Sequence, residues 1–112
     1  MVNKNSNRKK NGFMGFKKSI KPIDINYEDL ELKALKLCED NKFEKAEIIY
    51  KDLILNSNLS KLEIYYCNLA AISVRLGKSK EGIKLLESAL KINPNYFLAQ
   101  KNLAYALKNI GS

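Results

Sequence analysis

The sequence contains no histidine and no tryptophan, and it has only two cysteines and two prolines in 112 residues. Because histidine is the commonest general base and a frequent metal ligand, its absence removes the side chain on which most acid–base sites depend. Two thiols without histidine also fall short of the four ligands of a closed zinc site. We therefore expect no cofactor, no metal and no catalytic residues, and hence no enzyme.

The two cysteines, Cys38 and Cys67, are too few for a disulfide framework in a chain of this length. They are expected to be reduced, buried thiols. Long hydrophobic runs are also missing, since no segment reaches the roughly 18 apolar residues of a membrane helix. The start of the chain lacks the continuous apolar stretch of a secretory signal. These absences favour a cytoplasmic location.

Acidic residues are absent from positions 1–21, which carry seven Lys or Arg side chains. The whole chain has a net charge of +8, so positions 22–112 are close to neutral. Residues 1–26 are polar and low in complexity at their start, which is typical of a disordered tail. The residues of this tail that could contact nucleic acid or an anionic membrane are Arg8, Lys9, Lys10, Lys17 and Lys18.

The hydrophobic residues beyond the tail recur at spacings of three and four, which predicts an all-α fold with five helices. The first begins at Tyr27 and ends near Asn41, and the second follows from Phe43 to the turn-like stretch 56–60. Further helices are expected over about 61–76 and 79–92, with Gly77 as a C-terminal cap between them. Pro94 is expected in the first turn of a fifth helix that ends near Gly111.

Two stretches of the sequence repeat each other at a fixed offset. "NLAAISVRLG" begins at Asn68 and "NLAYALKNIG" begins at Asn102, so that Gly77 is matched by Gly111. One helix, a glycine, a second helix and a proline over about 34 residues resembles the tetratricopeptide repeat, a pair of antiparallel helices. The residues that carry the resemblance are Tyr66, Leu69, Ala70, Gly77, Leu86, Ala89 and Pro94.

The resemblance implies a right-handed solenoid of helical hairpins, with about two and a half repeats in residues 27–112. Residues 27–62 form the first repeat, 63–96 the second, and 97–112 a half repeat or capping helix. Gly82 stands where the family has alanine, at a cost of about 1 kcal/mol in a helix. The last helix is expected to cover the second repeat with Phe97, Leu98, Leu103, Ala104 and Leu107. Because about three repeats are usually needed for stability, self-association is a hypothesis.

In this family the first helix of each repeat lines a concave surface that holds a peptide or another protein. The resemblance carries that surface to the following residues: Glu28, Glu31, Leu35, Cys38, Ile64, Asn68, Ala71, Arg75, Leu98, Lys101, Asn102, Tyr105 and Lys108. Leu32, Glu39, Cys67, Val74 and Asn109 are also expected there. This surface would be acidic at one end, apolar in the middle and basic at the other, which suits a partner segment of complementary charge.

Three functions remain open at this point. The first is a protein-interaction module or adaptor without catalysis, which the resemblance to the tetratricopeptide repeat implies. A nucleic-acid-associated protein using the basic tail is the second. An accessory subunit of a transferase is the third, because such repeats are often fused to transferases. A fold resemblance alone does not choose among them.

Overall fold

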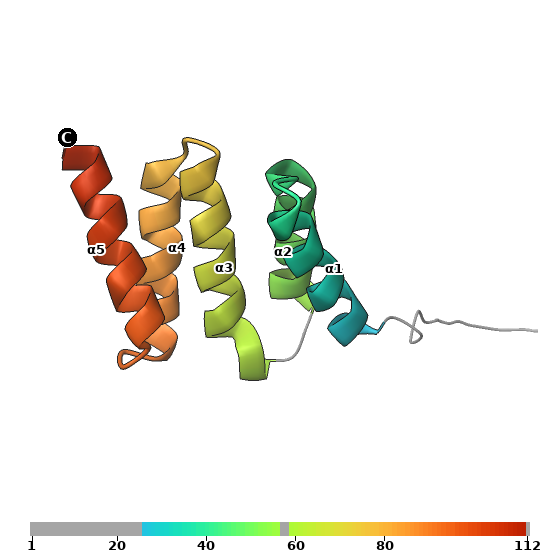
Figure 1. The fold of residues 1–112 in the computed structure, drawn as a ribbon. Helices are drawn as coiled ribbons and strands as arrows, with labels where there is room; N and C mark the ends of the chain where they lie inside the picture. Colours follow the sequence, from blue (N-terminus) through green and yellow to red (C-terminus); the bar gives the residue numbers. More distant parts are fainter. Residues whose placement is uncertain (1–25, 57–58, 112) are drawn as a thin grey trace, which may run out of the picture.

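The computed structural model describes residues 26–56 and 59–111, and within them it is all-α, as predicted. The helices are α1 (Tyr27–Glu39), α2 (Phe43–Asn56), α3 (Leu62–Arg75), α4 (Ser79–Ile92) and α5 (Phe97–Gly111), with a short 3-10 helix η1 (Leu59–Lys61) before α3. Two helical hairpins, α1–α2 and α3–α4, are followed by the single helix α5, with α1 and α5 at opposite ends of the row (Figure 1). Residues 1–25 of the predicted tail, with Arg8, Lys9, Lys10, Lys17 and Lys18, lie outside the described residues, and its last residue, Asn26, is the N-cap of α1.

Both hairpins turn at a residue with a left-handed backbone. Asn41 has a φ of 61° and Gly77 a φ of 81°. In each turn the residue that follows donates its N–H to the carbonyl five positions earlier: Lys42 to Leu37 at 2.8 Å and Lys78 to Ser73 at 2.7 Å. This bond closes a Schellman-type C-cap, for which Gly and Asn are the favoured residues. The two hairpins therefore use the same turn, as the predicted caps at Asn41 and Gly77 required.

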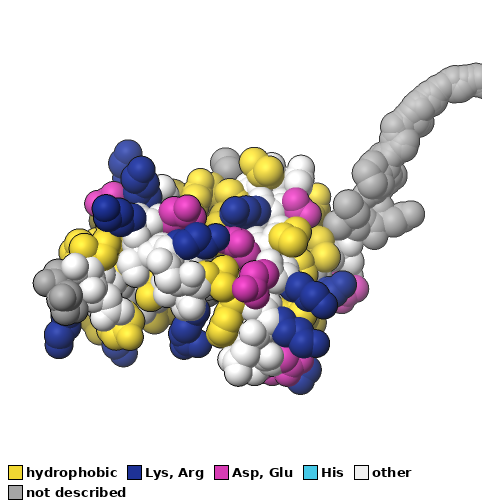
Figure 2. Space-filling model, turned by 90° about the horizontal axis from the view of Figure 1, so that it is seen from above, with side chains coloured by type: hydrophobic (Ala, Val, Ile, Leu, Met, Phe, Trp, Pro, Cys, Tyr) yellow, Lys and Arg dark blue, Asp and Glu magenta, His cyan; other side chains and the backbone are white. Residues whose placement is uncertain are grey.

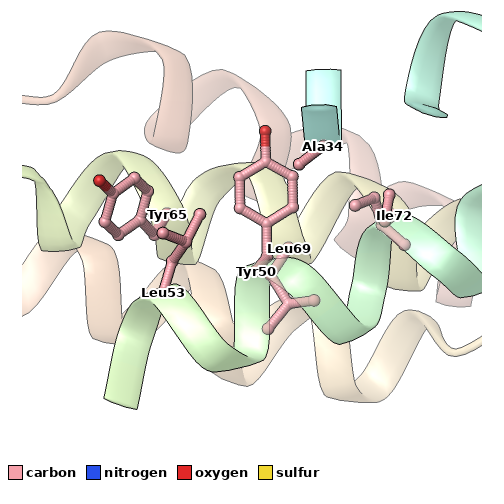
Figure 3. Close-up of a cluster of buried hydrophobic side chains, with 7 residues drawn as sticks. Ala34, Tyr50, Leu53, Tyr65, Leu69 and Ile72 are labelled. Carbon is pink, nitrogen blue, oxygen red and sulfur yellow. The ribbon is translucent and has the colours of Figure 1, made fainter. Parts of the chain in front are cut away.

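The first core cluster joins the first hairpin to α3. It contains Ala34 of α1, then Ala46, Tyr50 and Leu53 of α2, and Tyr65, Leu69 and Ile72 of α3. Figure 3 shows six of these side chains pointing into the space between the three helices. The rings of Tyr50 and Tyr65 lie 6.4 Å apart at 48°, a tilted arrangement that aromatic pairs favour. Because α3 completes this cluster, the first hairpin does not bury its apolar face alone.

The second core cluster joins α3, α4 and α5 and is built largely from alanine. Ala70, Ala89, Ala99 and Ala106 are fully buried in it, beside Leu86 and Cys67. Small side chains at these positions let the helix backbones approach closely. The same close approach explains why residue 82 is glycine. A Cβ there would lie 2.9 Å from Val74 Cγ2 and 3.1 Å from the Ala70 carbonyl oxygen. The glycine is thus required by the α3–α4 contact, which offsets its poor helix propensity.

Helix α5 covers the second hairpin, as predicted, but with a different face. Leu103 packs against the second cluster, whereas Phe97, Leu98, Ala104 and Leu107 are exposed, so this part of the prediction is wrong. The residues that do the covering are Ala99 and Ala106, because only a small side chain fits where α5 approaches α4 closely.

The expected place of Pro94 is also wrong. It lies in the turn before α5, which begins three residues later. In this turn the Asn93 side-chain oxygen accepts the N–H of Asn95 at 3.1 Å, and the Gln100 side chain donates to the Pro94 carbonyl at 2.8 Å. These hydrogen bonds satisfy backbone N–H and carbonyl groups between α4 and α5 that have no partner within a helix.

Candidate functional site

Two adjoining pockets lie along the face formed by α1, α3 and α5. The larger, the α1–α3 pocket, has a volume of about 320 Å³. Its lining residues are Leu35, Cys38 and Glu39 of α1, Phe43 and Tyr50 of α2, and Asn68, Ala71, Ile72 and Arg75 of α3. Apolar side chains with a few polar groups at the edge are typical of surfaces that bind small ligands or protruding side chains.

The smaller, the α3–α5 pocket, has a volume of about 120 Å³. It is lined by Ala70, Ala71, Val74 and Arg75 of α3, Leu86 of α4, and Asn102 and Tyr105 of α5. Ala71 and Arg75 line both pockets, so the two adjoin at these residues, and together they are called the groove below. Tyr105 is 61% exposed and is the aromatic side chain that the groove presents to solvent at this end.

Arg75 is the cationic group of the groove. Its guanidinium carbon lies 5.5 Å from the centre of the Phe43 ring, within the range of a cation–π contact. Phe43 is the first residue of α2, and the hairpin turn at Asn41 places it beside the C-terminal end of α3. The contact holds the positive charge between the two pockets, where it can bind a carboxylate with several N–H donors.

Two asparagines that hold the same position in successive repeats each reach into a neighbouring helix. Asn68 donates to the Tyr50 hydroxyl at 3.2 Å, and Asn102 donates to the Cys67 sulfur at 3.5 Å. Each amide therefore links its helix to the layer before it while also lining the groove. Both asparagines were predicted on this surface, but these bonds between layers were not predicted.

The cysteines are both free thiols, and neither is activated. Burial raises the pKa of Cys38, and the nearby charge of Arg75 opposes this only in part. Burial also raises the pKa of Cys67, against the hydrogen bonds of Asn102 and Tyr96. A thiol with a raised pKa is a poor nucleophile near neutral pH. Cys67 is buried in the second cluster, so its expected place on the groove surface is wrong.

The structure brings nine of the predicted surface residues into the groove. These are Leu35, Cys38, Glu39, Asn68, Ala71, Val74, Arg75, Asn102 and Tyr105. Eight others are partly or largely exposed but do not line either pocket: Glu28, Glu31, Leu32, Ile64, Leu98, Lys101, Lys108 and Asn109. Of these, Glu31 is engaged across the hairpins, because its carboxylate accepts from Lys61 Nζ at 3.0 Å.

Five groove residues were missed: Phe43, Tyr50, Ala70, Ile72 and Leu86. Each packs in or against a core cluster and also contributes part of its surface to the groove. Phe43, Tyr50 and Leu86 come from the second helix of a hairpin, whereas the predicted surface used only first helices. The left-handed Asn41 turn was the available signal for Phe43, because it starts α2 next to α3.

Charges of both signs are spread over the molecule. Figure 2 shows Lys, Arg, Asp and Glu side chains interspersed with apolar ones on the face seen from above. In the described part of the chain no three metal-binding side chains come together. No helix among those residues has the length and apolarity needed to cross a bilayer.

No family model, no curated protein and no solved structure matches this chain. The function is therefore inferred from the groove.

Proposed function

We propose that this protein is an interaction module of tetratricopeptide type, which binds an extended segment of another protein in the groove along α1, α3 and α5. The observation that carries the proposal is that the two pockets adjoin at Ala71 and Arg75. An extended segment places successive side chains a few ångströms apart, so that one can enter each pocket. The mainly apolar lining favours apolar side chains at both positions.

Arg75 narrows the chemistry of the partner. Its guanidinium stands between the pockets, and among the described residues only one acidic side chain, that of Glu39 at the α1 end, lines either of them. A carboxylate on the partner, next to an apolar anchor, would pair with Arg75. We therefore propose a segment with two apolar side chains and an acidic residue between them.

The test is a comparison of two arginine substitutions at exposed positions. Ala71→Arg places a long side chain where the two pockets meet, whereas Ile48→Arg changes an exposed residue of α2 away from the groove. Proteins that crosslink to the wild-type chain in lysate are identified, and the bound segment is titrated as a synthetic peptide. We expect Ala71→Arg to weaken the peptide at least about tenfold and Ile48→Arg to leave its affinity unchanged.

Equal binding by wild type and Ala71→Arg would place the partner elsewhere and end the proposal. Circular dichroism of both variants checks that the helices are intact. Arg75→Lys is a further arm: it retains the charge but loses the planar fork, so an acidic residue bound by Arg75 should bind more weakly.

A further inference from the structure

Helix α5 has a side that no described element covers. The offset of the sequence repeat relates Ala70 and Ser73 of α3 to Ala104 and Leu107 of α5. Ala70 and Ser73 are buried where Gly82 of α4 approaches them. Their counterparts are exposed, Leu107 by 52%, and Phe97 on the same side is 71% exposed. The place that α4 fills on α3 is thus open on α5.

The charge of this side is positive. Phe97, Lys101, Ala104 and Lys108 follow one another at steps of four, three and four, so they share one face of α5, with Leu107 beside it. Helix α5 contains no Asp or Glu at all. A second α5 packed on this face would bring four lysines together, which disfavours a symmetric contact between two copies of α5.

The opposite end of the molecule has the complementary character. On α1, Glu28, Leu32, Leu35 and Glu39 are exposed and also follow at steps of four, three and four. Leu32 is 64% exposed. Helix α1 carries four acidic residues and two lysines. Helix α1, which carries this acidic face with apolar residues at its centre, stands at one end of the row, and α5, which carries the basic face, stands at the other (Figure 1). Leu35 and Glu39 of the α1 face also border the groove.

We propose that the α5 face of one copy (Phe97, Lys101, Ala104, Leu107, Lys108) docks on the α1 face of a second copy (Glu28, Leu32, Leu35, Glu39). Opposite charges and two exposed apolar stripes supply the attraction. The contact is heterologous, so each dimer retains one free face of either kind and can add further copies. One helix on one helix is a small interface, so the association is weak and sensitive to salt.

A charge-reversal experiment on the full chain tests this arrangement by sedimentation velocity over a concentration series. Lys101→Glu/Lys108→Glu makes both ends acidic, and Glu28→Lys/Glu39→Lys makes both ends basic. Each variant alone should associate at least about tenfold more weakly than wild type. An equimolar mixture of the two should associate again, because opposite ends then meet. Lys45→Glu/Lys91→Glu, at exposed positions on α2 and α4, is the control and should behave as wild type.

Three outcomes would overturn the proposal. The wild-type chain could remain strictly monomeric up to about 1 mM. The dissociation constant of the contact would then lie above this concentration, which is too weak for the proposed docking. Either variant could still associate by itself, which would point to a symmetric contact or to another surface. The mixture could stay monomeric although both variants are folded by circular dichroism. Leu35 and Glu39 also line the α1–α3 pocket, so Lys101→Glu/Lys108→Glu, which changes no residue of either pocket, separates this proposal from that of the groove: it should weaken the association and leave the affinity for the groove peptide unchanged.

Discussion

At the scale of single residues, the two hairpin turns test how backbone conformation contributes to stability. Asn41 and Gly77 occupy the same position of the same turn, with φ of 61° and 81°. A left-handed backbone costs L-residues about 1–2 kcal/mol, and Asn less than most. We expect Asn41→Gly to raise the free energy of unfolding by about 0.5 kcal/mol, since the relief of strain is partly offset by the greater freedom of the unfolded chain.

The matched substitution is made at Gly77 in the second turn, and its effect on the free energy of unfolding should have the opposite sign. A Cβ at Gly77 would meet no atom within 4 Å, so Gly77→Ala changes the backbone energy without a clash. It should lower the free energy of unfolding by about 1 kcal/mol, and Gly77→Asn by less. Urea denaturation followed by circular dichroism measures all three. A stabilising Gly77→Ala would show that the left-handed turn is not retained.

At the scale of helices, the spacing of apolar residues was enough to predict where each helix lies, and Asn41 and Gly77 were enough to predict the hairpin turns. The buried face of α5 was not predicted, because large apolar residues were assumed to face the core. The sequence repeat held the missing signal: Tyr65, Leu69 and Ile72 of α3 are buried, and their counterparts in the next repeat are Ala99, Leu103 and Ala106.

Two alanines of α5 test which face is buried. Ala106 is fully buried, whereas Ala104 is exposed. Ala106→Leu forces three more carbon atoms between α5 and α4 and should lower the free energy of unfolding by about 1–3 kcal/mol. Ala104→Leu adds the same atoms on the outer side and should change stability by less than about 0.5 kcal/mol. Thermal and urea unfolding of the two variants compare them directly, and equal losses would contradict the observed face.

At the scale of the whole molecule, α3 connects the two halves of the core. It contributes Tyr65, Leu69 and Ile72 to the first cluster and Cys67 and Ala70 to the second. Stability in such stacked arrays is close to a sum of units and their interfaces. The groove follows from the same arrangement, since its two pockets lie on either side of α3. The family resemblance predicted the groove residues of first helices, but those of second helices depend on how closely the hairpins stack.

Because of the same close stacking, we expect the free energy of unfolding to fall at alkaline pH. Burial raises the pKa of Cys38, Cys67 and Tyr96, and that of Tyr50 to about 12, although the hydrogen bond from Asn68 opposes the shift of Tyr50. The folded state therefore holds these protons at pH values where the unfolded chain has released them. Each group contributes its full stability below its unfolded pKa, and the contribution is lost as pH rises towards the folded value.

Tyr50 gives this prediction a defined window, between its unfolded pKa of 10.0 and its folded pKa of about 12. Across that window the phenol should reduce the free energy of unfolding by up to about 1.4 kcal/mol per pH unit. Tyr50→Phe removes the titrating group while the thiols remain. Urea unfolding at pH 8, 10 and 11.5 should therefore give a shallower decline for the variant than for wild type. Parallel declines would mean that the Tyr50 hydroxyl is hydrated in the folded protein, which contradicts the 1% exposure of this side chain.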